Sequence, residues 1–289
     1  MIFYALTILL DGVSFGMLLF VISVGLTVTM GLMRVVNLAH GSFAMAGGYI
    51  AALMTQNGID FHVAVVAAMV AAGTIGGVCE VVFYRPLYRK GDLAQVLLTV
   101  GLVFVSIAAV TAIFGAFPYP VVMPKYMSAL VDIGFRTYPA YRLFVLAVGA
   151  VIAAVLWYVI EYSLIGARLR ASVDNPRMAR GVGMNVNMLF SITFIVGCAL
   201  AGLGGAIGAG MLALEPTYAL KYIVLFLLVV IVGGEGSFKG SFVAAIALGI
   251  IDTIGRYLIP DIAPYMIYFA VIVLLLWRPK GLLPPRALA

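Results

Sequence analysis

The chain has 289 residues, a mean hydropathy of +1.19, a hydrophobic content of 65% and only 10% charged residues. These values lie far outside the range of soluble globular domains. The net charge of +6 comes from basic residues clustered at the ends of apolar runs, so it does not indicate a nucleic-acid-binding surface.

Apolar runs of about 20 residues, the length that crosses about 30 Å of hydrocarbon as a helix, recur along the whole chain. The alternating ten-residue segments typical of a membrane β-barrel do not occur in the sequence. In lipid, helices satisfy their own backbone hydrogen bonds. The sequence therefore predicts an all-α polytopic membrane protein with about eight or nine transmembrane helices. The predicted spans are 5–31, 41–57, 62–84, 95–117, 141–162, 187–213, 218–234, 239–259 and 264–278.

The lysines and arginines are distributed unevenly between the two sets of span ends. Twelve of the 17 lie at the side of the membrane where the first, third and fifth spans end. The other five lie at the opposite side. Because basic residues accumulate in cytoplasmic loops, this bias predicts an external N-terminus and a cytoplasmic C-terminus.

Two segments interrupt the apolar pattern in a similar way, "RVVNLAHGSFAMAGGYI" (34–50) and "VGGEGSFKGSFVAAIALGI" (232–250). Each is an irregular, glycine-containing stretch that leads into a small-residue helix at a Gly-Ser-Phe triplet. Corresponding interruptions in two halves of a transporter point to its substrate path, through broken or re-entrant helices. The predicted path residues are Asn37, His40, Gly41, Ser42, Gly233, Gly234 and Ser237.

Two explanations of these segments remain open at the level of sequence. Backbone N–H groups at an unwound helix start would favour a substrate carboxylate, and glycine would allow close approach of the backbone to it. Alternatively, the small residues only let membrane helices pack closely. His40 is similarly open between a ligand or titrating group and a structural, hydrogen-bonded histidine.

The segment 165–186, "IGARLRASVDNPRMARGVGMNV", places four arginines between two apolar runs. Asn175 can cap a helix whose first position is Pro176, and "RMAR" supplies about one turn before Gly181 and Gly183 end it. A short capped helix in a chain of otherwise short loops favours a docking knob for another protein. A solvated basic loop that follows the charge bias is the alternative.

Charged residues within predicted spans include Asp11, Glu80, Asp252 and Arg256, and such groups face protein or water because lipid disfavours them. Asp252 and Arg256 are four residues apart and are expected to pair on one helix face. Glu80 is expected to extend toward Arg85 at the inner interface. Asp11 is expected to be hydrated near the outer end.

Taken together, five separated motifs resemble those of permease subunits of branched-chain amino acid ABC importers, of the LivH type. The motifs are the insert at 165–186, "RVVNLAHGSFAMAGGYIAA" (34–52), "YRPLYRKGDLAQVLLTVGL" (84–102), "VVIVGGEGSFKGSFVAA" (229–245) and "WRPKGLL" (277–283). They occur in the expected order along essentially the whole chain. Glu235 departs from the pattern, where an apolar residue is expected.

The resemblance implies a single permease domain over 1–289, with a cytoplasmic coupling loop at 163–186, in the cytoplasmic (inner) membrane of a bacterium or archaeon. It implies an importer built from two permease chains, two ABC ATPase subunits and an external (periplasmic) substrate-binding protein. The second permease chain is expected to be similar but distinct. The residues expected to couple to the ATPase are Arg170, Asp174, Asn175, Pro176, Met178, Ala179, Arg180 and Gly183.

The chain has no G-x-x-x-x-G-K-[ST] phosphate-binding loop, so ATP and Mg are expected on the partner ATPase subunits. We expect no enzymatic activity, catalytic residue, metal or bound cofactor on this chain. The predicted function is passage of branched-chain amino acids or a related small polar solute, with urea, amides and aromatic acids left open. The alternative is a secondary transporter or channel driven by an ion gradient, for which Asp11, Glu80 and Asp252 are the candidate groups.

Overall fold

The computed structural model describes residues 2–33, 37–87, 90–132, 134 and 136–283. Its elements are α1 Ile2–Met33, α2 His40–Gln56, α3 Phe61–Cys79, η1 Glu80–Tyr84, α4 Arg85–Leu87, α5 Asp92–Phe114, β1 Leu130–Asp132, β2 Thr137–Pro139, α6 Ala140–Tyr162, α7 Leu164–Asp174, α8 Pro176–Gly181, α9 Val186–Gly208, α10 Tyr218–Gly233, α11 Phe238–Leu258 and α12 Ala263–Trp277.

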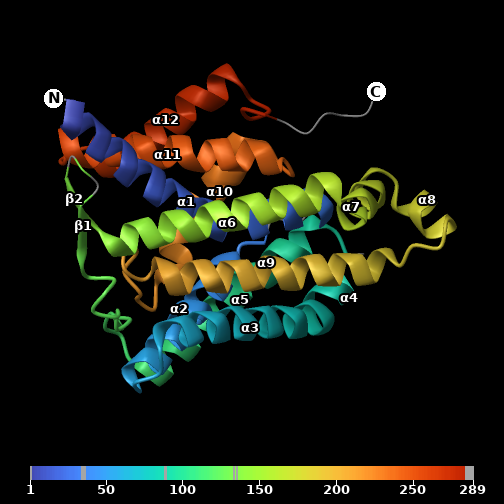
Figure 1. The fold of residues 1–289 in the computed structure, drawn as a ribbon. Coiled ribbons are helices and arrows are strands. Elements are labelled where there is room, and N and C mark those ends of the chain that lie inside the picture. The colour runs from blue at the N-terminus through green and yellow to red at the C-terminus, as the bar shows by residue number, and fades with distance from the viewer. Residues whose placement is uncertain (1, 34–36, 88–89, 133, 135, 284–289) are drawn as a thin grey trace.

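The helices form one bundle, and six of those described are long and apolar enough to cross a membrane. Three shorter helices, α2, α10 and α12, account for the other predicted spans. The start of α1 and the β1–β2 hairpin lie at one end of the bundle, whereas α7 and α8 project at the other (Figure 1). The predicted polytopic all-α fold is confirmed.

Helix α1 lies at the centre of the bundle, in contact with α6, α9, α10 and α11. Its segment 18–22 is fully buried. Glycines set the distance to its neighbours: a Cβ added at Gly16 would lie 2.7 Å from the Ala245 carbonyl of α11, and one at Gly25 would lie 2.4 Å from the Gly197 carbonyl of α9. The core is therefore held by direct contact between helix backbones, as small residues permit in membranes.

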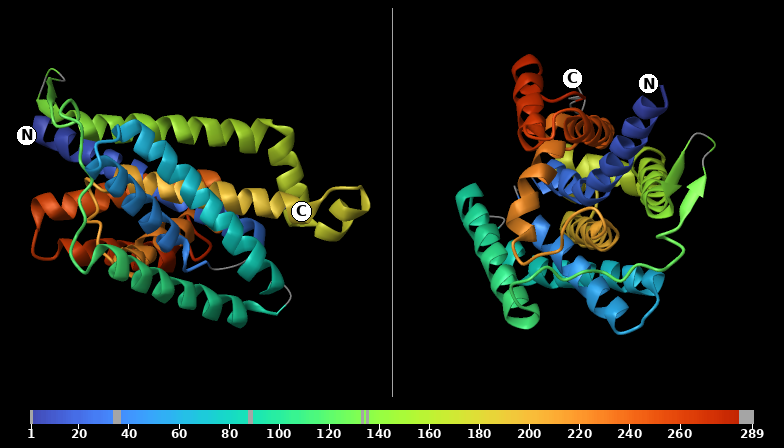
Figure 2. Two further views of the ribbon diagram at one scale, coloured as in Figure 1. Left: turned by 90° about the horizontal axis from the view of Figure 1, so that it is seen from below. Right: turned by 90° about the vertical axis from the view of Figure 1, so that its left-hand side faces the viewer.

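The regular pattern is interrupted where the sequence predicts it. Helix α2 begins at His40, immediately before the first Gly-Ser-Phe triplet, and α11 begins at Phe238, the last residue of the second. The start of α2 meets the start of α10, because Gly41 packs on the Ala219 backbone. Helix α10 crosses the direction of α6 and α9 steeply (Figure 2).

The predicted span 187–213 is too long, because α9 ends at Gly208. The segment that follows is irregular yet partly buried, with Leu212 and Leu214 in the core. The Leu214 carbonyl accepts a hydrogen bond from the Tyr119 N–H at 2.9 Å. The apolar pattern could not separate this packed loop from a continued helix.

The two expected ion pairs of the spans are present. Arg256 Nε lies 2.7 Å from Asp252 Oδ2, and Arg85 Nη2 lies 2.9 Å from Glu80 Oε2. Each carboxylate is largely buried beside its own arginine.

The expectation that Asp11 is hydrated is wrong. Its side chain is 6% exposed, pairs with Arg142, and accepts hydrogen bonds from the hydroxyls of Tyr138 at 2.7 Å and Tyr257 at 2.6 Å. Burial raises the pKa of Tyr138 to about 12, so its hydroxyl remains a donor at neutral pH. Tyr138 belongs to the β1–β2 hairpin, which the sequence did not predict. The contacts of Asp11 with Arg142 and Tyr257 connect α1 to α6 and α11.

Replacement of Gly205 by alanine is expected to lower the free energy of unfolding by about 1–3 kcal/mol. The added Cβ would lie 1.8 Å from the Ala44 carbonyl oxygen of α2, so two helix backbones must separate. Thermal unfolding of the purified protein in detergent measures the effect.

Gly101→Ala is the matched control, since no atom lies within 4 Å of an added Cβ at this position of α5. An equal loss in both variants would contradict the packing explanation.

Candidate functional site

The cytoplasmic loop predicted at 163–186 contains two helices, α7 and α8, where the sequence predicts one short helix. Ser163 is extended and its hydroxyl accepts a hydrogen bond from the Gly166 N–H at 3.2 Å, which starts α7. A Cβ at Gly166 would lie 2.1 Å from the Ile160 carbonyl oxygen, so the sharp corner after α6 requires glycine. Helix α7 differs from the sequence-based prediction, which places a helix only after Asn175.

Helix α8 follows the predicted capping pattern. The Asn175 side chain accepts a hydrogen bond from the Met178 N–H at 3.0 Å, and Pro176 occupies the first turn. Beyond the helix, Gly183 has φ +86°, a left-handed conformation that favours glycine. The predicted cap, proline start and glycine stop are confirmed, and they make α8 a defined projection.

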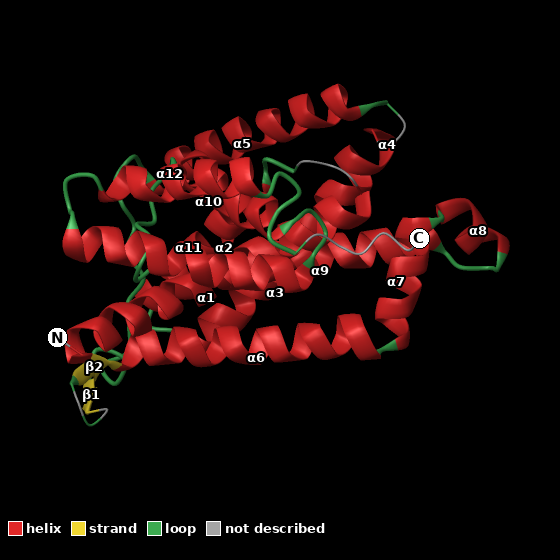
Figure 3. Cartoon of the chain, turned by 90° about the horizontal axis from the view of Figure 1, so that it is seen from above, coloured by secondary structure: helices red, strands yellow, loops and turns green. Residues whose placement is uncertain are grey.

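The surface of this projection combines apolar and cationic side chains. Met178 is 69% exposed and Val182 71% exposed, whereas Ala179 is buried beneath them. Arg177 and Arg180 are exposed beside Met178. Helix α7 turns across the end of the bundle, and α8 extends past it (Figure 3). Exposed apolar side chains among charges are typical of protein-contact surfaces.

Ion pairs connect the base of the α7–α8 loop to the bundle. Glu161, at the end of α6, pairs with Lys239 of α11, and Arg170 of α7 lies 3.9 Å from its carboxylate. The Lys239 Nζ also lies 5.2 Å from the centroid of the Trp157 ring. This cluster joins the loop to α6 and α11, next to the second interrupted segment.

The first group of predicted path residues is buried at the start of α2. Asn37 Oδ1 accepts hydrogen bonds from the Ala39 N–H at 3.0 Å and the Tyr84 hydroxyl at 2.7 Å. The His40 Nε2 atom lies 2.8 Å from the Ile22 carbonyl oxygen of α1. His40 therefore has a structural hydrogen bond, which agrees with the second of the two explanations for this residue.

Ser42 and Gly41 complete this group on other sides of α2. The Ser106 hydroxyl of α5 donates to Ser42 Oγ at 2.7 Å, and Gly41 packs against Ala219 of α10. The segment thus lies where α1, α2, α5 and α10 meet, and helix packing closes it in this conformation.

The second group forms the tight turn between α10 and α11. Gly234 has φ +98°, and Ser237 caps α11 by accepting from the Gly240 N–H at 3.1 Å. The Gly233 carbonyl accepts from the Leu283 N–H at 3.3 Å, so the "WRPKGLL" segment folds back over the turn. Glu235 is exposed at its tip.

The two groups do not form one site. His40 contacts α1 at Ile22, whereas the second turn contacts α1 through Gly236 against Gly31. These positions are about 13 Å apart along the helix axis, at 1.5 Å per residue. Each group instead fixes one interrupted helix start against α1.

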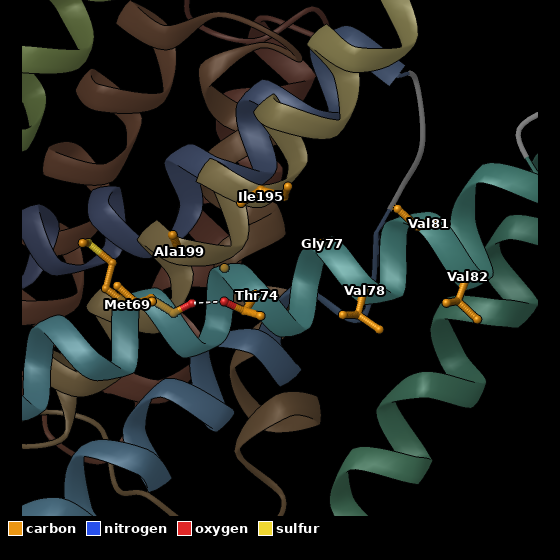
Figure 4. A pocket seen from close by; sticks show the side chains of 10 residues that line it. Met69, Thr74, Gly77, Val78, Val81, Val82, Ile195 and Ala199 are labelled. Carbon is orange, nitrogen blue, oxygen red and sulfur yellow. Dashed lines mark hydrogen bonds between the residues drawn. The ribbon is translucent and has the colours of Figure 1, made fainter.

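An apolar groove lies on the outer face of α3, η1 and α9 (Figure 4). Its polar side chain, Thr74, donates to its own helix at the Val70 carbonyl, 2.8 Å away. Such a surface suits lipid or an apolar protein face and offers nothing to a polar solute.

Sequence reasoning missed the contacts that surround the start of α2. Tyr84 and Ser106 hold Asn37 and Ser42, and Ser191 of α9 contacts Arg85. The one sequence signal was Glu80 inside an apolar run, five residues before an arginine.

Residues 8–276 match a family model described as the permease component of the branched-chain amino acid transport system. The chain is 26% identical to the high-affinity branched-chain amino acid transport system permease protein LivH of Escherichia coli, over 97% of this chain and 96% of the relative. It is 25% identical to the corresponding protein BraD of Pseudomonas aeruginosa, over 98% and 96%. A probable LivH of Methanocaldococcus jannaschii is 25% identical, over 96% and 90%.

Among solved structures, the chain resembles PsaBC from Streptococcus pneumoniae in complex with a Fab. The TM-score is 0.52 at 14% identity, over 95% of this chain and 91% of that one. This likeness concerns the fold alone.

Replacement of Asn175 by alanine is expected to destabilise α8 by about 1 kcal/mol, because the cap on the Met178 N–H is lost. Amide hydrogen exchange in 177–181 should become about fivefold faster.

Asn175→Asp keeps a side-chain acceptor and should exchange at nearly the native rate. Equal exchange in all three proteins would show that the cap does not hold the helix.

Proposed function

Since the family model spans nearly all of it, the chain belongs to the branched-chain amino acid transport system permeases, and we propose that it forms part of the translocation path of an ATP-driven importer. It is a multi-pass protein of the cytoplasmic (inner) membrane. The proposed substrates are branched-chain amino acids or a related small polar solute, delivered by an external binding protein. Residues 1–289 act as one permease domain, paired with a second, similar permease chain.

The observation that carries this proposal is the shape of the cytoplasmic loop. A capped helix with Met178 exposed among arginines projects beyond the bundle, while Ala179 packs below it. We assign this surface to the ATPase subunits, which bind ATP and Mg. The ion pairs of Glu161 with Lys239 and Arg170 make the loop base move with α6 and α11.

The proposed path runs past both interrupted helix starts, which are separate sites along α1, with α2 and α10 at its centre. In the described conformation Gly41 touches Ala219, and Ser42 is held by Ser106. Access therefore requires α2 and α10 to separate, as a rigid-body displacement driven through the loop would do. The chain supplies geometry for passage and performs no covalent chemistry.

The gradient-driven alternative needs carboxylates that change charge as solute moves. Asp11, Glu80 and Asp252 each lie in an ion pair with a neighbouring arginine. Protonation of any of these largely buried carboxylates would break its ion pair with the neighbouring arginine, which is costly. The pairs favour structural roles for these groups and so favour the importer.

Uptake of radiolabelled leucine into proteoliposomes tests the proposal. The permease chains, ATPase subunits and binding protein are reconstituted together, and uptake is expected to require ATP and the binding protein and to persist with a protonophore. Unlabelled isoleucine, urea and short amides added as competitors define the substrate class.

Omission of the ATPase subunits is the control. Uptake that continues without them and stops with the protonophore would contradict the importer and support the gradient-driven alternative.

A further inference from the structure

The segment Glu80–Tyr84 continues α3 as a π-helix, with the Arg85 N–H bonded to the Glu80 carbonyl five residues earlier. In an α-helix, residues five apart point about 140° away from each other. The wider π turn brings them toward one face, and such turns are frequent at functional sites. Valines 78, 81 and 82 of this region face outward (Figure 4), whereas Glu80 and Tyr84 are buried against the bundle.

The first contact of the turn reaches α9. The buried Glu80 carboxylate is held by Arg85 Nη2 at 2.9 Å, and the same Nη2 donates to Ser191 Oγ at 2.9 Å. Ser191 lies in the second turn of α9, which starts at the Asn185 cap where the cytoplasmic loop ends. A displacement of that loop would therefore move Ser191, in the first two turns of α9, and with it the Arg85 side chain of the π turn.

The second contact reaches the start of α2. The Tyr84 side chain is 1% exposed, and its hydroxyl donates to Asn37 Oδ1 at 2.7 Å. The same Asn37 oxygen also accepts a hydrogen bond from the Ala39 N–H, in the turn before α2. The ring centroids of Tyr84 and Phe194 are 4.8 Å apart, and those of Phe194 and Phe43 are 6.1 Å apart.

We propose that the π turn links ATPase docking to the substrate path, with Ser191, Arg85, Glu80 and Tyr84 as positioning residues. Rewinding of 80–84 into an α-helix would turn Glu80 and Arg85 to different faces and draw the Tyr84 hydroxyl from Asn37. The start of α2 would lose its anchor. In this proposal the turn has two conformations, π-helical and α-helical. Contacts to the loop and contacts to the start of α2 both shift the equilibrium between them, as coupling between distant sites requires. This inference rests on the proposed function.

Two conservative variants break one contact on each side of the turn. Tyr84→Phe removes the hydroxyl that donates a hydrogen bond to Asn37 and keeps the ring contact with Phe194. Ser191→Ala removes the hydroxyl that accepts a hydrogen bond from Arg85. In the reconstituted importer, leucine uptake and ATP hydrolysis are measured together. The ratio of leucine transported to ATP hydrolysed is expected to fall about fivefold in each variant, the effect of losing one hydrogen bond.

Matched controls separate coupling from general damage. Thr193→Ala removes a hydroxyl that bonds only within α9, to the Leu189 carbonyl, two residues from Ser191. Tyr158→Phe alters an exposed tyrosine on α6. Both should retain the native ratio, and thermal unfolding should confirm that all variants are folded.

The double variant Y84F/S191A gives a second criterion. If both contacts act through one turn, its ratio is no lower than that of the worse single variant. A native ratio in the single variants, a parallel loss of uptake and hydrolysis, or multiplicative effects in the double variant would each overturn the inference. The proposed function fails separately, if the native complex itself shows no ATP-dependent uptake.

Discussion

Close contact between helix backbones is the constraint on which the rest of the structure depends. In lipid no hydrophobic force draws helices together, so packing of small residues has to hold them. Gly25 of α1 meets Gly197 of α9, and Gly205 of α9 meets Ala44 of α2, each at backbone distance. These contacts fix α1, α2 and α9 as one block against which the other helices are placed.

Buried carboxylates near the two ends of the bundle have specific partners, because lipid disfavours an unpaired charge. Asp11 is enclosed by Arg142 and two tyrosines at the end that carries the hairpin, and Glu80 by Arg85 toward the end that carries α7 and α8. These clusters stiffen the bundle, and the start of α11 lies beside the base of the α7–α8 loop, where Lys239 pairs with Glu161. A stiff block with two interrupted helices fits the proposed coupling, in which a rigid-body displacement is transmitted through the bundle.

Much of the fold follows from sequence because the governing signals are local. Apolar length predicts the spans, and the order Asn175, Pro176 and Gly183 predicts α8 with its ends. Features that depend on distant partners were missed. The hairpin that buries Asp11 lies in an irregular loop, and α7 lies between the predicted end of a span and the Asn175 cap. The π turn differs from an α-helix only through the contacts of Tyr84 and Arg85.

The central claim, that the projecting loop is a cytoplasmic docking surface for an ATPase, is tested by labelling one cysteine. Met178→Cys is made with Cys79 and Cys198 replaced by alanine, in a background that retains uptake, and Ile59→Cys marks the opposite end. A membrane-impermeant thiol reagent is applied to whole cells and to inside-out vesicles, with and without the ATPase subunit. The account predicts that position 178 labels only in vesicles, that the ATPase protects it, and that position 59 labels in whole cells. Labelling of position 178 from outside, or from inside without protection, would contradict it.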